Sequence, residues 1–103
     1  ARKLWIAFAV GASGRIVVDQ GARRALTESG RSLLAAGVIE VEGSFESDAA
    51  VELVDTDGVV FAKGLTRLRS AELRAAAGQR TGDLPDGAPR EVIHRDDLVI
   101  LPD

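Results

Sequence analysis

Residues 14–45 alternate between short apolar runs and polar turns, a pattern that predicts a strand, a short helix and a second strand. Residues 15–18 are rich in β-branched side chains, which favour extended backbone. Asp19 follows them and can accept hydrogen bonds from the free N–H groups of a helix start. Apolar residues then recur at helical spacing as far as Gly30, a residue type that often ends helices in a left-handed conformation.

The segment after this helix predicts a buried turn and an amphipathic strand. Residues 32–34 form a short, mainly apolar segment that is expected to pack into the core, and the next strand begins at Gly37. With a side-chain period of two, we expect Ile39, Val41 and Phe45 to share the buried face. The opposite, solvent-facing side would then hold Glu40, Glu42, Ser44 and Glu46.

The remaining apolar runs predict further strands on both sides of this unit. Residues 4–10 are apolar and are interpreted as a first strand, packed on the domain by its aromatic side chains. A turn with Asp48 in a left-handed conformation leads to a strand over 50–54. The sequence Asp-Thr-Asp-Gly at 55–58 predicts a hairpin, and the return strand over 59–65 is expected to break at Gly64.

A second short helix and two closing strands complete the prediction. Ser70 is expected to cap the helix and Gly78 to end it. Glycines and prolines over 79–90 predict a loop. Residues 91–94 and 98–101 are interpreted as closing strands, joined by a bend of charged residues.

Length and pattern together predict one mainly β domain of the α+β class, a mixed-strand pseudo-barrel with two short helices. The single domain covers 1–103, divided into a leading segment (1–12), a core (13–78), a loop (79–90) and closing strands (91–101). The chain starts at Ala1 and has no methionine. We therefore expect it to be a piece of a longer protein.

The charge of the chain is unevenly distributed. The formal net charge is −3, but residues 1–36 carry six basic and two acidic side chains, whereas residues 37–62 carry seven acids and no base. The basic first third can form a local patch, although the average is not that of a strong nucleic-acid binder. There is no cysteine for disulfide or thiolate chemistry. No apolar run approaches the roughly 20 residues of a membrane helix, so no membrane association is expected.

We find no catalytic, cofactor-binding or metal-binding constellation in the sequence. His94 is the only histidine and cannot form a usual zinc site without cysteines. The triplet at 94–96 matches the catalytic loop of protein kinases, but Leu101 stands where that loop needs an asparagine for magnesium. The start of the helix after Asp19 has two interpretations. Its free N–H groups can donate hydrogen bonds to an RNA phosphate, or they can donate to the side chain of Asp19. We favour the interpretation in which Asp19 caps the helix.

Three pieces of the pattern carry a resemblance to a known family. They read V-D-x-G-A-x-x-A-L, S-L-L-x-x-G-V and V-x-G-x-F. The residues concerned are Val18, Asp19, Gly21, Ala22, Ala25, Leu26, Ser32, Leu33, Leu34, Gly37, Val38, Val41, Gly43 and Phe45. This pattern resembles the PUA domain, a small pseudo-barrel. With the flanking segments at 2–6 and 92–99, nearly the whole chain is similar to the C-terminal PUA domain of the bacterial glutamate 5-kinase family.

The resemblance implies an accessory or regulatory domain. Enzymes of that family phosphorylate the γ-carboxylate of glutamate with ATP and magnesium in proline biosynthesis, in the cytoplasm. Their active site belongs to an amino-acid-kinase domain, which would be the partner of this chain in a homo-oligomeric parent. None of that domain is present here, so the resemblance implies no catalytic residue and no cofactor site in this chain.

The alternative is an RNA-binding module, either in the same protein or in an RNA-modifying enzyme. In PUA domains that bind RNA, the groove is generally formed by the first helix and its adjoining strands. By resemblance, the candidate RNA-contact residues are Arg15, Arg23, Arg24 and Arg31, with Arg67 and Arg69 as outside candidates. Aromatic side chains for base stacking are scarce and the middle of the chain is acidic, so we rank the structural or regulatory role first.

Overall fold

The computed structural model describes residues 2–9, 11–84 and 90–102, without the side chains of residues 2 and 81. Short 3₁₀ turns are labelled η. The elements are α1 (Arg2–Phe8), β1 (Gly14–Val18), α2 (Gln20–Ser29), β2 (Leu33–Leu34), η1 (Ala35–Gly37), β3 (Val38–Gly43), β4 (Ala50–Val54), β5 (Val60–Leu65), α3 (Ser70–Ala76), η2 (Thr81–Asp83), β6 (Glu91–Ile93), η3 (Arg95–Asp97) and β7 (Leu98–Ile100).

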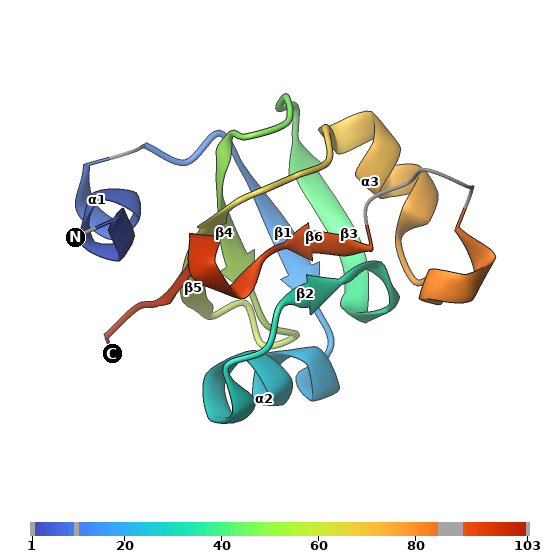
Figure 1. Ribbon diagram of the computed structural model, residues 1–103, viewed down its shortest axis with the longest axis horizontal. Coiled ribbons are helices and arrows are strands. Elements are labelled where there is room, and N and C mark those ends of the chain that lie inside the picture. Colours follow the sequence, from blue (N-terminus) through green and yellow to red (C-terminus); the bar gives the residue numbers. More distant parts are fainter. Residues whose placement is uncertain (1, 10, 85–89, 103) are drawn as a thin grey trace.

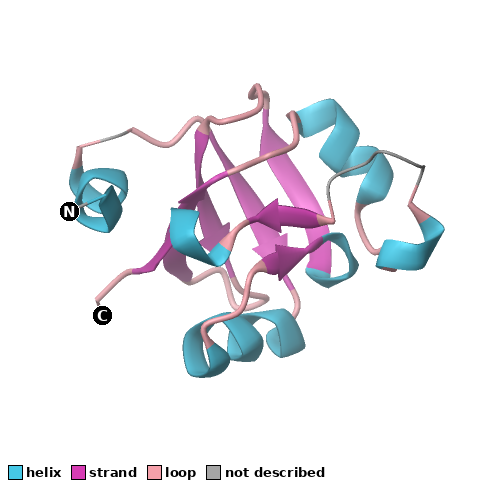
Figure 2. Ribbon diagram, viewed as in Figure 1, coloured by secondary structure: helices cyan, strands magenta, loops and turns pink. Residues whose placement is uncertain are grey.

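Two sheets make up the β structure (Figures 1 and 2). The larger sheet has five strands in the order β3-β1-β4-β5-β7. Strands β1 and β4 run parallel, and the other neighbours are antiparallel. The short antiparallel pair β2–β6 crosses one face of this sheet. The predicted α+β class and mixed-strand pseudo-barrel are confirmed.

The core lies between the two sheets. Side chains from β1 and β4 on one side meet side chains from β2 and β6 on the other. Leu26 from α2 and Leu73 from α3 belong to this core, whereas Ile6 from α1 is buried outside it. Burial of apolar surface is the main stabilising contribution in such a small domain.

The predicted ends of α2 and the predicted hairpin are confirmed. Asp19 Oδ1 accepts a hydrogen bond from the N–H of Ala22 at 2.7 Å, and Gly30 ends the helix with φ of 60°. In the hairpin, Gly58 has φ of 82°. Asp48 has φ of 69°, as predicted for the turn before β4. These features depend on contacts a few residues apart, which the sequence displays directly.

The interpretation of residues 4–10 as a strand is wrong for residues 4–8, which belong to helix α1, and residue 10 lies outside the described part of the chain. Ile6 is fully buried, and the helix packs against β5, β7 and η3. The N–H of Ala9 donates to the carbonyl of Trp5 at 2.9 Å, so backbone groups are satisfied within the helix. The chain therefore has three α-helices in its described part, one more than predicted.

The predicted burial of Ile39 is also wrong, since its side chain is 52% exposed. The pairing of β1 with β3 shifts here: Val17 faces Glu40 and Val18 faces Val38. This β-bulge inserts Ile39 as an extra residue and resets the alternation. Val38 is therefore buried in the core in place of Ile39.

Gly64 does not break β5, contrary to the prediction. It pairs with Val51 on one side and with Leu98 on the other. A Cβ at this position would lie 2.8 Å from Ile93 Cγ2 and 2.9 Å from the carbonyl oxygen of Asp97. The glycine serves close packing of β6 and η3 on the sheet.

Ser70 does not cap α3 but is its first residue. Its hydroxyl accepts from the N–H of Phe45 at 3.1 Å and donates to the same residue's carbonyl at 3.3 Å. The N-cap position belongs to Arg69, whose N–H donates to Glu72 Oε1 at 3.3 Å. Gly78 follows the helix with φ of 80°, as its predicted end.

The two closing strands are confirmed as β6 and β7, although they pair with different sheets. The predicted loop over 79–90 contains η2, and its residues 85–89 lie outside the described part of the chain.

Candidate functional site

Three open depressions of about 180, 260 and 440 Å³ lie between α2, β2, η3 and β7. Arg31 lines all three, and Arg95 lines the first and the third. We call the three depressions together the Arg31 groove.

Local structure and strand pairing together build the groove. The left-handed Gly30 turns the chain out of α2, and the N–H of Arg31 donates back to the carbonyl of Ala25 at 3.3 Å. The β2–β6 pair then brings η3 alongside, where the N–H of Arg95 donates to Ser32 Oγ at 2.8 Å. Two segments far apart in sequence thus meet at the groove.

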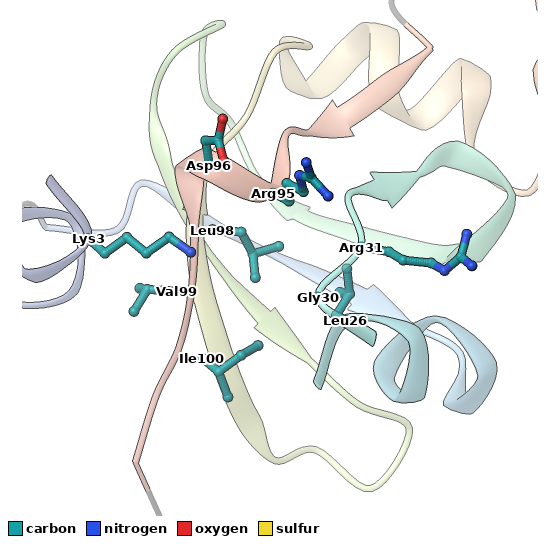
Figure 3. A pocket seen from close by; sticks show the side chains of 9 residues that line it. All are labelled: Lys3, Leu26, Gly30, Arg31, Arg95, Asp96, Leu98, Val99 and Ile100. Atoms are coloured by element: carbon teal, nitrogen blue, oxygen red, sulfur yellow. The ribbon is translucent and has the colours of Figure 1, made fainter. Parts of the chain in front are cut away.

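The groove carries three cations whose side chains have no ionic partner within the described residues: Lys3, Arg31 and Arg95. Figure 3 shows Lys3 reaching from α1 towards β7, whereas the Arg31 side chain extends away from α1. Such cations can attract an anionic ligand, because each would gain a charged partner without losing one.

Three acidic residues also line the groove: Asp19, Glu91 and Asp96. Asp19 Oδ1 accepts the N–H of Ala22 at 2.7 Å. Glu91 forms an ion pair with Arg67 at 3.8 Å. Asp96 Oδ2 lies 3.5 Å from His94 Nδ1, but this nitrogen accepts the N–H of Asp96 at 3.0 Å and therefore has no proton to donate to the carboxylate. The acids therefore offset the positive charge of the groove only in part.

Of the four arginines proposed as RNA contacts, only Arg31 lines the groove. Arg15 pairs with Glu52 at 3.0 Å and Arg24 pairs with Glu28 at 3.5 Å. Arg23 pairs with a buried carboxylate. RNA contact by these four residues stays a prediction. Because the other three arginines are ion-paired, Arg31 is the strongest candidate among them.

The two outside candidates are also engaged in ion pairs on the surface. Arg67 pairs with Glu91 and Arg69 lies 3.6 Å from Glu72. Both partners in the second pair are more than half exposed, so the pair contributes little to stability.

The start of α2 supports the interpretation that we favoured. Asp19 Oδ1 accepts the N–H of Ala22, and the carbonyl of Asp19 accepts the N–H of Arg23 at 2.9 Å. The chain itself thus supplies acceptors for this helix start, which leaves less reason for an external phosphate there.

Sequence reasoning missed Lys3 and Arg95 as groove residues. The sequence places Arg95 in the charged bend between the two closing strands. Its backbone does form the turn, but its side chain lines two of the three depressions. Arg95 reaches the groove because residues 33–34 pair with β6. The sequence does not indicate that these two segments pair, so the position of Arg95 could not be predicted.

The described residues contain no group of three or more His, Asp or Glu side chains that can hold a metal ion. Among the same residues, no helix combines the length and apolar character needed to span a membrane.

Curated proteins similar to this chain are glutamate 5-kinases. The enzyme of Acaryochloris marina is 44% identical over 97% of this chain, and that of Myxococcus xanthus is 47% identical over 98%. In both cases the match covers 28% of the relative's own length. The chain thus spans between a quarter and a third of the curated relatives.

Solved structures similar to this chain support the fold. A PUA domain from Aeropyrum pernix K1, solved as a tartrate complex, has a TM-score of 0.62 and 27% identity, covering 91% of this chain and 48% of that one. A PUA domain protein from Thermoplasma acidophilum has a TM-score of 0.58 and 19% identity, covering 91% and 56%. The family model described as the PUA domain matches residues 14–88. The chain therefore belongs to the PUA domain family.

Proposed function

We propose that this chain is the C-terminal accessory domain of a glutamate 5-kinase. The observation that carries this proposal is similarity at 40–47% identity across 97–98% of the chain. The parent enzyme would transfer the γ-phosphate of ATP to L-glutamate and form glutamyl 5-phosphate in proline biosynthesis. It would act in the cytoplasm as a homo-oligomer.

In this proposal the chain itself carries no catalysis. Phosphoryl transfer needs Mg²⁺ held by carboxylates beside the nucleotide phosphates. As the resemblance to the relatives implies, the proposal assigns ATP, Mg²⁺ and glutamate to the amino-acid-kinase domain of the parent, and gives this domain a regulatory or structural role.

The test uses the full-length gene product and a version truncated before residue 2. Glutamate-dependent formation of ADP is measured for both, with and without proline, and subunit assembly is followed by light scattering. We expect activity in the full-length protein and a changed proline response or assembly after truncation. No glutamate-dependent activity in the full-length protein would overturn the kinase assignment. Identical behaviour of the two versions would overturn the regulatory role.

The second candidate function is RNA binding, and the Arg31 groove favours it. Lys3, Arg31 and Arg95 are available there for phosphate oxygens. Binding through phosphates releases counterions, so affinity for a structured RNA should fall steeply with salt. The measurement is a fluorescence anisotropy titration at low and at physiological salt. Absence of binding at low salt would reject this function.

A further inference from the structure

Helix α1 exposes three large apolar side chains to solvent. Leu4 is 62% exposed, Trp5 54% and Phe8 74%. The same helix buries Ile6 completely. We call the three exposed side chains the α1 outer face.

The helical repeat explains why these side chains gather on one side. Leu4 and Phe8 are one turn apart, and Trp5 lies beside them on the same arc. Ile6 points in nearly the opposite direction, into the contact with β5 and β7. A helix that is apolar on both sides is typical of an element buried between two bodies. Figure 1 shows α1 at one end of the molecule, beside the sheet.

The comparisons separate α1 from the rest of the domain. The PUA family model matches residues 14–88 and does not include α1. The glutamate 5-kinases match 97–98% of the chain, so their similarity extends into α1. These relatives are also much longer, since the match covers 28% of each. The residues of α1 are thus similar to the glutamate 5-kinases but are not part of the PUA family model.

We propose that the α1 outer face docks against another domain of the same polypeptide. This inference rests on the proposed function in one respect: it requires that the chain is part of a protein as long as the glutamate 5-kinases that it matches. A partly exposed tryptophan flanked by leucine and phenylalanine is the composition of the core of an interface, where aromatic anchors contribute most. Ile6 fastens α1 to this domain, so that docking of the outer face would fix the orientation of the two domains.

The test measures burial of α1 in the full-length gene product. Ala9 is exposed next to the outer face, and Ala9→Cys introduces a thiol without removing any of the three apolar side chains. Ser47→Cys, at the exposed turn between β3 and β4, is the matched control. The chain has no cysteine of its own. The rate of maleimide labelling at each position is read by mass spectrometry of the modified peptide.

We expect the thiol at position 9 to react at least about tenfold more slowly than the thiol at position 47. Adding Trp5→Glu places a charge in the contact and should bring the rate at position 9 to within about twofold of the control. Equal rates without Trp5→Glu would overturn the proposal. Protection that disappears on dilution would assign the face to a second copy of the chain, which also overturns it.

This result is independent of the kinase assay. A full-length protein that lacks glutamate-dependent activity but protects position 9 would retain the docking face and lose the kinase assignment. An active enzyme with position 9 fully reactive would do the opposite.

Discussion

Arg23 on α2 and Asp55 at the end of β4 form an ion pair, with 3.2 Å between Nε and Oδ2. Asp55 is only 5% exposed, and its Oδ1 accepts the N–H groups of Asp57 and Val59. The guanidinium also lies 5.2 Å from the ring centre of Phe61. One arginine thus ties α2 to the β4–β5 hairpin, which explains its position better than an RNA contact does.

Arg23→Ala should lower the free energy of unfolding by about 1–3 kcal/mol, because it leaves a buried carboxylate without its cation. The neighbouring Arg24 offers a matched control, since its pair with Glu28 is exposed on both sides. We expect Arg24→Ala to change the free energy of unfolding by about 0.5 kcal/mol or less. Urea unfolding of the two variants measures the difference. Equal effects would show that the buried pair does not stabilise the fold.

Gly64→Ala should destabilise the domain by about 1–3 kcal/mol, since the added methyl group meets a side chain and a backbone oxygen at less than 3.0 Å. Gly11→Ala is the control, because nothing lies within 4 Å of a Cβ there. Thermal unfolding followed by circular dichroism compares the two. A variant at position 64 as stable as the control would contradict the close packing of Ile93 on β5.

Asp48→Gly should raise the free energy of unfolding by up to about 1 kcal/mol. The residue has φ of 69°, where a side chain is strained and glycine is not. Part of this gain is offset because glycine increases the entropy of the unfolded chain. Ser47→Gly has the same entropic penalty without any strain to relieve, so it should destabilise. If both substitutions shift the urea midpoint in the same direction, the turn is not strained.

Arg31→Ala and Arg95→Ala should each weaken RNA binding in the full-length protein. Each should also reduce the slope of log affinity against log salt by about 0.7 to 0.9, the value for one lost phosphate contact. Arg24→Ala, outside the groove, should leave affinity and slope unchanged. Fluorescence anisotropy at several salt concentrations gives both quantities. A larger loss from Arg24→Ala than from Arg31→Ala would place the RNA on the outer face of α2 instead.

Where sequence reasoning predicted structure correctly, the responsible contacts are short in sequence. Asp19 reaches an N–H three residues away, and Asp55 accepts the N–H groups of its own turn. Where it was wrong, the structure depends on contacts with residues far away in the sequence. The helix α1 is stabilised by packing on β5 and β7, and a short apolar run does not distinguish helix from strand. The exposure of Ile39 follows from a bulge that is defined only by pairing with β1.

The sequence by itself determined the α+β class, most strands, both ends of α2 and the resemblance to the PUA domain, because these depend on local backbone preferences and on residue spacing. Only the tertiary structure decided that Arg23 meets Asp55, and that Lys3, Arg31 and Arg95 line one groove. Charged side chains on separate elements interact through space, and their distances are determined by how sheets and helices pack. The order of residues along the chain does not encode those distances directly.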